Sequence, residues 1–237
     1  MSRSALLAQM RWLAEGGRLV SLDDLEAFVA DRRELRPDSV LVTIDDGCRS
    51  LFSEALPVLR DYAVPAVAFV TVGLVGRAAG AGISREAHMT WDELAILRNA
   101  GIVIASHALT HRSLARLTDE EARDEAHRSR ELLEQRLGVP VGAFAYPFGT
   151  RADHGPATDR VLAECGYRLA FHAMHGSIRP GMDPLRLPRV KIEGGEGLWL
   201  FQLSVMGGMD AWRGVDHLLW KAQQRRREPD AESASDG

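Results

Sequence analysis

The stretch that decides the fold is Val40-Leu41-Val42-Thr43-Ile44-Asp45-Asp46-Gly47, an apolar, β-branched run that ends abruptly in two carboxylates. Unbroken apolarity over 40–44 is typical of a strand that is buried on both faces, as strands in parallel sheets are. Two adjacent carboxylates after such a strand are costly unless something compensates their charge. The alternative is an Asp-Asp-Gly turn that closes a hairpin, but the helical pattern that follows disfavours it.

Strand and helix patterns alternate along the rest of the chain. Further apolar runs predict strands at 66–70, 102–105, 143–145, 167–171 and 187–192. Capping boxes and terminal glycines predict helices at about 6–15, 21–30, 91–100, 119–137 and 157–165. This alternation predicts parallel strands with helical crossovers, which build either a barrel or an open doubly wound sheet.

Polar side chains follow three of the predicted strands. They are Asp45-Asp46, Ser106-His107 and Tyr146. Because the sites of parallel barrels are built at the C-terminal ends of the strands, this arrangement favours a barrel. An open sheet obeys a similar rule at its switch point, so the second architecture stays open.

The histidines His107 and His111 lie four residues apart, and a helix or a compact turn brings two such imidazoles to one side. Taken alone, the pair is a weak signal for a metal site, and a surface or capping role fits it better. Together with one carboxylate of Asp45-Asp46, it makes the three-ligand set of a catalytic zinc-type site with an open position for water. A divalent ion there would lower the pKa of that water and polarise a carbonyl, and the second Asp could act as general base.

Three segments resemble the motifs of a known family. Residues 43–47, Thr-Ile-Asp-Asp-Gly, look like the first motif of the polysaccharide deacetylases (the NodB-homology or carbohydrate esterase family 4 group), usually T-F-D-D-G. Residues 106–111, Ser-His-Ala-Leu-Thr-His, are similar to the second motif, H-[ST]-x-x-H, with Ala108 replacing the hydroxyl residue. Residues 144–149, Phe-Ala-Tyr-Pro-Phe-Gly, resemble the third motif as found in exopolysaccharide and poly-N-acetylglucosamine deacetylases. The resemblance runs from about Leu13 to Gly207.

The resemblance implies a distorted (β/α)7 TIM-like barrel, the NodB-homology fold. It also implies that Asp45 is the general base and that Asp46, His107 and His111 hold one divalent metal, usually Zn²⁺. The backbone N–H of Tyr146 would help to hold the oxyanion of the reaction. Relatives of this branch begin with a further strand that this chain lacks, so the expected barrel lacks an N-terminal strand.

Three further residues are candidates for substrate binding: Pro147, Phe148 and Arg189. Many family members carry an Arg three residues before the third-motif Tyr, where it contacts the catalytic Asp, but Ala143 occupies that position here. Arg151 and Arg189 are therefore the two candidates to orient Asp45.

The general acid has no match to the family pattern, because the late segment 187–194 contains no histidine. His172 and His175, which follow the strand predicted at 167–171, are the candidates to protonate the leaving amine, with a plain loop role as the alternative.

The expected activity is metal-dependent hydrolysis of N-acetyl groups on an amino-sugar polysaccharide or glycan precursor. Two alternatives stay open. One is a hydrolase of another C–N bond, such as a cyclic amide, on the same fold, and the other is a catalytically idle glycan-binding relative.

Composition bounds the remaining expectations. The 237 residues predict a single deacetylase domain over 1–222 and a disordered polar tail over 223–237. The net charge of −4 argues against a nucleic-acid binder, and no segment approaches the roughly 20 apolar residues of a membrane span. Without a visible signal peptide, the chain is expected to be cytoplasmic, or secreted or envelope-associated if its N-terminus is truncated. Cys48 and Cys165 are expected to be free thiols.

Overall fold

The centre of the fold is a curled parallel sheet whose strand order follows the chain, β1-β2-β3-β4-β5. The strands are β1 (Val42–Ile44), β2 (Ala66–Val70), β3 (Val103–Ser106), β4 (Ala143–Ala145) and β5 (Leu169–Phe171). All four pairings are parallel. Because the order never reverses, the sheet is wound in one direction only, as in a barrel, and the doubly wound alternative is wrong. The hairpin alternative after β1 is also wrong, because β1 pairs in parallel with the next strand, β2, whereas a hairpin joins antiparallel strands.

The computed structural model describes residues 1–80, 85–192, 194–195 and 197–208. The tail predicted at 223–237 and the end of the domain predicted for 1–222 lie outside the described residues.

Single parallel bridges flank the sheet on both sides. Leu19 pairs with Val40 beyond β1, and Leu187 pairs with Phe171 beyond β5. Five strands and two bridges thus form a distorted, incomplete (β/α) barrel, as predicted. The strand predicted over 187–192 is wrong beyond Leu187, because Pro188 has no N–H to donate and Arg189 donates instead to the Met174 carbonyl, which breaks the register.

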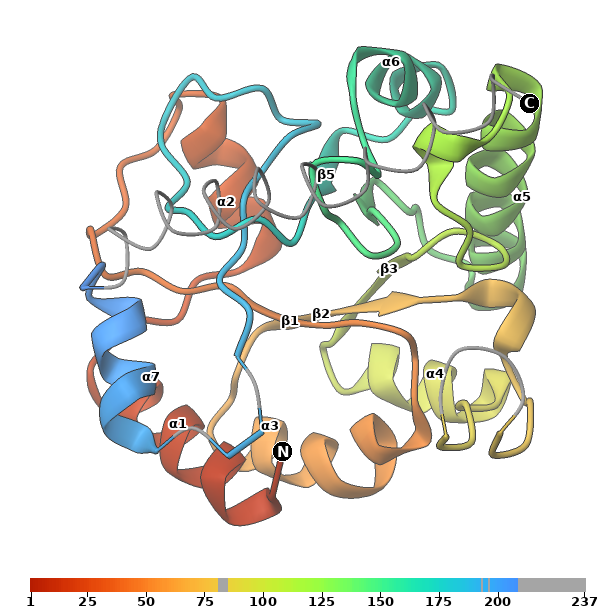
Figure 1. Cartoon of the computed structure of the whole chain (residues 1–237). Coiled ribbons are helices and arrows are strands. Elements are labelled where there is room, and N and C mark those ends of the chain that lie inside the picture. Colours follow the sequence, from red (N-terminus) through yellow and green to blue (C-terminus); the bar gives the residue numbers. More distant parts are fainter. Residues whose placement is uncertain (81–84, 193, 196, 209–237) are drawn as a thin grey trace, which may run out of the picture.

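Apart from α2, the helices from α1 to α6 surround the sheet in chain order, as Figure 1 shows from α1 at the bottom through α4 and α5 to α6 at the top. The helices are α1 (Arg3–Glu15), α2 (Leu22–Val29), α3 (Leu56–Asp61), α4 (Trp91–Asn99), α5 (Asp119–Leu137), α6 (Pro156–Glu164) and α7 (Leu198–Val205). A π-helical turn (Leu51–Ala55) precedes α3, and 3-10 turns occupy Val72–Leu74 and Leu114–Arg116. The capping boxes predicted at Ser21, Thr90 and Thr118 are all present. None of the described helices is long and apolar enough to cross a bilayer.

Strand side chains alternate between two apolar clusters. In β2, Ala66, Ala68 and Val70 belong to an outer cluster that also contains buried residues of α1, α3, α4, α5 and α6. Val67 and Phe69 point the other way, into an inner cluster that Leu25 and Val29 of α2 complete. The barrel interior is therefore a packed core with α2 against it, and polar side chains gather only beyond it, at the C-terminal ends of the strands.

Strand β1 departs from the predicted burial on both faces. All three of its residues are half-buried, whereas β2, β4 and β5 are fully buried. The reason is that β1 lies at the edge of the sheet. Beyond this edge, the pairing found among the described residues is the single bridge between Leu19 and Val40, which precedes β1. Neither Cys48 nor Cys165 forms a disulfide.

The inner cluster predicts a large stability difference between two apolar truncations. Leu25 is 6% exposed in that cluster, so Leu25→Ala is expected to lower the free energy of unfolding by about 2–5 kcal/mol. Ile96 on α4 is 46% exposed, so Ile96→Ala is expected to change it by no more than about 0.5 kcal/mol. Urea titration of both variants measures the difference, and equal losses would contradict the assignment of α2 to the core.

Candidate metal centre

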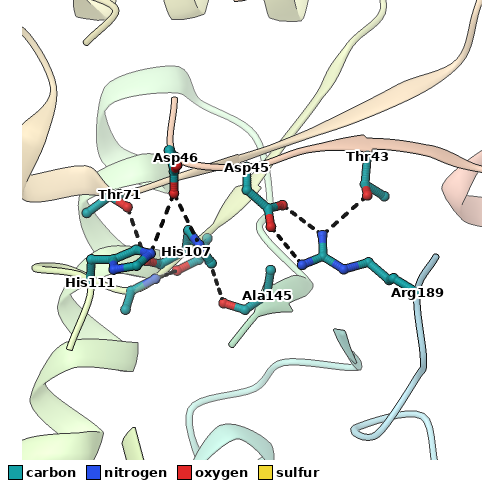
Figure 2. Close-up of polar contacts among 10 residues, drawn as sticks. Thr43, Asp45, Asp46, Thr71, His107, His111, Ala145 and Arg189 are labelled. Carbon is teal, nitrogen blue, oxygen red and sulfur yellow. Dashed lines mark hydrogen bonds and ion pairs between the residues drawn. The ribbon is translucent and has the colours of Figure 1, made fainter. Parts of the chain in front are cut away.

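Three side chains from two strand ends converge on one point. One oxygen of Asp46 and one ring nitrogen each of His107 and His111 lie within 4.8 Å of one another. The Asp46 carboxylate is 3.5 Å from Nε2 of both rings, and Figure 2 shows it pointing toward them. The two imidazoles are only 3% and 8% exposed, which rules out a surface pair.

The ring of His107 is oriented by its neighbours in the sheet. Its Nδ1 lies 2.7 Å from the Ala145 carbonyl at the end of β4, and its backbone N–H donates to Val70 at the end of β2. A carbonyl can only accept, so Nδ1 carries a proton, and Nε2 is the ring nitrogen that faces Asp46. This arrangement is typical of metal-binding histidines, whose second nitrogen donates to a carbonyl or carboxylate.

His111 is oriented by packing. Its Nδ1 is buried and has no hydrogen-bond partner among the described residues, while its ring packs edge-on against His107 and Phe148 at 4.8 Å each. Burial and the neighbouring His107 lower the pKa of His111 below its ordinary value. The neutral imidazole that results is the form that binds a metal.

Two adjacent aspartates face different partners because the backbone turns sharply between them. Asp46 has a φ of 70°, in the left-handed region that non-glycine residues rarely adopt, and Gly47 follows with 78°. Asp45 continues the inward alternation of β1, whereas Asp46 is turned toward the histidines (Figure 2). A side chain at Gly47 would also come within 3.1 Å of Val70. Strain of this kind is typical of functional sites.

Arg189 holds Asp45 with both ends of its guanidinium. Nη1 and Nη2 each donate to one carboxylate oxygen at 2.7 Å, and Nη1 also donates to Thr43 at 3.2 Å. Of the two candidates to orient Asp45, the structure therefore favours Arg189 over the exposed Arg151. Because its terminal nitrogens are engaged by the protein, orientation of Asp45 fits Arg189 better than the predicted contact with substrate.

The environment of Asp45 favours its ionised form. Burial raises the pKa of this carboxyl, but the nearby His107 and the hydrogen bonds and charge of Arg189 lower it by more. The pKa of Asp45 therefore lies below its ordinary value, which keeps the carboxylate ready to accept a proton at neutral pH.

The third motif is placed beside the site, with one difference from expectation. The ring of Phe148 contacts that of His111, and this residue is 59% exposed, whereas Pro147 is buried. The backbone N–H of Tyr146 donates to the Phe171 carbonyl at 2.9 Å, so it is not free in this geometry. Its oxyanion role stays a prediction, one that requires this bond to be shared or broken.

The side chain of Tyr146 is fixed in the outer layer. Its hydroxyl donates to Asp159 at 2.6 Å, and Arg186 holds the other oxygen of Asp159. Burial and Asp159 raise the pKa of Tyr146 well above its ordinary value, so the phenol stays protonated. This leaves the side chain a structural role.

The candidate general acids do not gain support. His172 accepts a hydrogen bond from the Met174 N–H at its Nδ1 and stacks flat on His154 at 4.7 Å. Burial and His154 lower the pKa of His172 to about 4, so at neutral pH the ring is the neutral imidazole and not the more acidic imidazolium. For His175, as for His172, the role of general acid stays a prediction.

Glu125 is a residue of the site's surroundings that sequence reasoning missed. It is 4% exposed on α5, and its carboxylate accepts the N–H groups of Leu109 and Thr110, between the two histidines. The available signal was a carboxylate on the buried stripe of a helix. That stripe is Ala122, Glu125, Ala126, Ser129, Leu133 and Leu137.

Comparisons with known proteins agree with this geometry. The family model described as polysaccharide deacetylase matches residues 32–170, more than half of the chain. YxkH of Bacillus subtilis is 26% identical over 190 residues, covering 79% of this chain and 64% of that protein. The poly-β-1,6-N-acetyl-D-glucosamine N-deacetylase of Staphylococcus epidermidis is 22% identical over 194 residues, covering 78% and 65%. This chain thus spans slightly less than two thirds of the length of these two relatives.

Solved structures show the same fold. IcaB from Ammonifex degensii superimposes with a TM-score of 0.75 at 27% identity, covering 87% of this chain and 90% of that one. The Streptococcus pyogenes deacetylase PplD, solved in complex with acetate, gives 0.76 at 20% identity and 86% coverage of each chain, a likeness of fold alone. With the matched family model and the motif residues gathered at one strand end, the chain belongs to the polysaccharide deacetylase family.

Proposed function

We propose that this protein removes N-acetyl groups from an amino-sugar polymer with the help of one divalent metal ion, zinc being the expected one. The observation that carries the proposal is the convergence of Asp46, His107 and His111 beside an ionised Asp45. The name of the Staphylococcus epidermidis relative supports an N-acetylglucosamine polymer as the substrate class.

The residues fit a metal. Two neutral imidazole nitrogens and one carboxylate oxygen are the ligand set of catalytic zinc sites. The ring of His107 is held in the correct tautomer by the Ala145 carbonyl, and the low pKa of His111 leaves it neutral. A divalent ion bound there would supply Lewis-acid chemistry, which lowers the pKa of water and polarises an acetamide carbonyl.

Asp45 is the proposed general base. Its carboxylate is ionised, and the two hydrogen bonds from Arg189 fix its plane without using all of its lone pairs. It can therefore accept the proton of a water molecule that attacks the acetamide carbon. A fixed base avoids the cost of ordering a mobile side chain during the reaction.

Phe148 is the proposed contact to the sugar. It is a large aromatic side chain, 59% exposed, held beside the ligand His111 with a φ of 62°. A bulky residue in the left-handed region is costly, which argues for a role at this position. Its exposed face offers an apolar surface for the C–H groups of a pyranose ring.

Removal of the histidine ligands tests the proposed metal site. The wild type is expected to retain about one zinc per chain after purification and dialysis, and a His107→Ala/His111→Ala double variant is expected to retain little. Elemental analysis of both proteins gives the ratio, with circular dichroism as the control for folding, because ligands and folding can be coupled.

Acetate release from N-acetylglucosamine oligomers should accompany the bound metal. It should stop on addition of a chelator and return with zinc. Metal binding with glycan binding but no acetate release would point to the idle relative instead. Ring opening of a cyclic amide, with no acetate released from the oligomers, would point to the other C–N hydrolase.

The ion pair on Asp45 predicts a change in the pH profile. The base works only when ionised, and Arg189 holds its pKa low, so Arg189→Met should raise that pKa. The acidic limb of kcat/KM is then expected to move up by about 1–3 pH units, so that activity is lost at a higher pH than in the wild type. Arg151→Met is the matched control and should leave the limb in place. If Arg151→Met moves the limb instead, Arg151 is the residue that acts on the base.

A further inference from the structure

The turn that carries both histidine ligands is strained. Ala108 and His111 have φ values of 63° and 65°, and neither is glycine. Such residues persist only when surrounding contacts over-determine the backbone. Ala108 is fully buried, and it has no side-chain hydroxyl with which to tie the turn to itself.

One side of this turn is held by the segment after β2. The N–H groups of Val72 and Gly73 donate to the carbonyls of Ala108 and Leu109, at 3.2 and 2.7 Å. A side chain at Gly73 would meet the Leu109 oxygen at 2.7 Å, so the approach requires glycine. These contacts engage carbonyl groups of the turn and leave the N–H groups of Leu109 and Thr110 to another partner.

That partner is the buried carboxylate of Glu125 on α5. One of its oxygens accepts the N–H of Leu109 at 3.0 Å and that of Thr110 at 2.8 Å, and the other accepts the Thr110 hydroxyl. Among the ion pairs of the described residues, none includes Glu125. A carboxylate is costly to bury, so three charge-assisted hydrogen bonds to one turn account for its place there.

We infer that Glu125 is a positioning residue that sets the metal affinity of the site by fixing the backbone immediately before His111. The inference rests on the proposed metal site. His107 is oriented by a ring hydrogen bond, but Nδ1 of His111 has none within the described part of the chain. The position of the His111 ring therefore depends on its packing against His107 and Phe148 and on its backbone, and the backbone just before it is held by α5 through Glu125.

Zinc affinity, measured by competition with a chromogenic chelator on the full chain, tests this inference. Glu125→Ala, which removes all three hydrogen bonds, is expected to weaken binding about 10- to 100-fold. Glu125→Gln keeps the size but loses the charge, and Thr110→Val removes one bond at an exposed residue, so each should weaken binding less, up to about tenfold. Glu131→Gln is the matched control, because it makes the same change on the exposed face of α5 and should change affinity less than twofold.

Thermal unfolding of the metal-free proteins separates positioning from mere stability, with affinities measured where every variant is folded. If Glu125→Gln and Thr110→Val lower the melting temperature yet bind zinc as tightly as the wild type, the inference is overturned. The same two variants decide the matter if Glu125→Ala does not fold. A wild type that binds no zinc would overturn the proposed metal site itself, a result distinct from equal binding by wild type and variants.

Discussion

The end of the barrel at which the strands have their C-terminal ends depends on one interaction, the ion pair between Asp45 and Arg189. It joins the end of β1 to the segment beyond β5, across an interval that no ladder of hydrogen bonds fills among the described residues. The guanidinium lies 5.5 Å from the ring of Phe69, a residue of the inner core, and the Arg189 side chain is 14% exposed. A charge in that position needs a partner, and the partner is Asp45, the proposed base. One contact thus joins the two ends of the incomplete barrel and also holds the Asp45 carboxylate in place.

The same contact lets two adjacent carboxylates coexist. Side by side and unpaired, they would raise each other's affinity for protons. The positive φ of Asp46 separates them, so that Asp45 keeps the inward direction of the strand and Asp46 faces the two imidazoles. One carboxylate is neutralised by Arg189, and the other is left for an ion. The proposed base and the proposed metal ligand therefore differ in their partners, although both are aspartates.

The parts of the fold that local sequence predicts are those with local causes. Apolar runs located β1 to β5 and capping boxes located three helices, because strand burial and helix capping are properties of neighbouring residues. Asp46, His107 and His111 were found because strand ends meet at one edge. The failures are long-range. The choice between Arg151 and Arg189 depended on a contact across 144 residues, and the bond that occupies the Tyr146 N–H depends on the register of β4 against β5.

The two histidine ligands are held by different parts of the molecule. His107 is fixed by β2 through its backbone and by β4 through its ring, so its position is as stable as the centre of the sheet. His111 lies four residues further on, beyond the sheet, and depends on a strained turn held from α5. A disturbance of α5 would therefore act on His111 through the turn, whereas the ring of His107 keeps its hydrogen bond to β4. Because three ligands must converge for tight binding, the less firmly held one limits the affinity of the whole site.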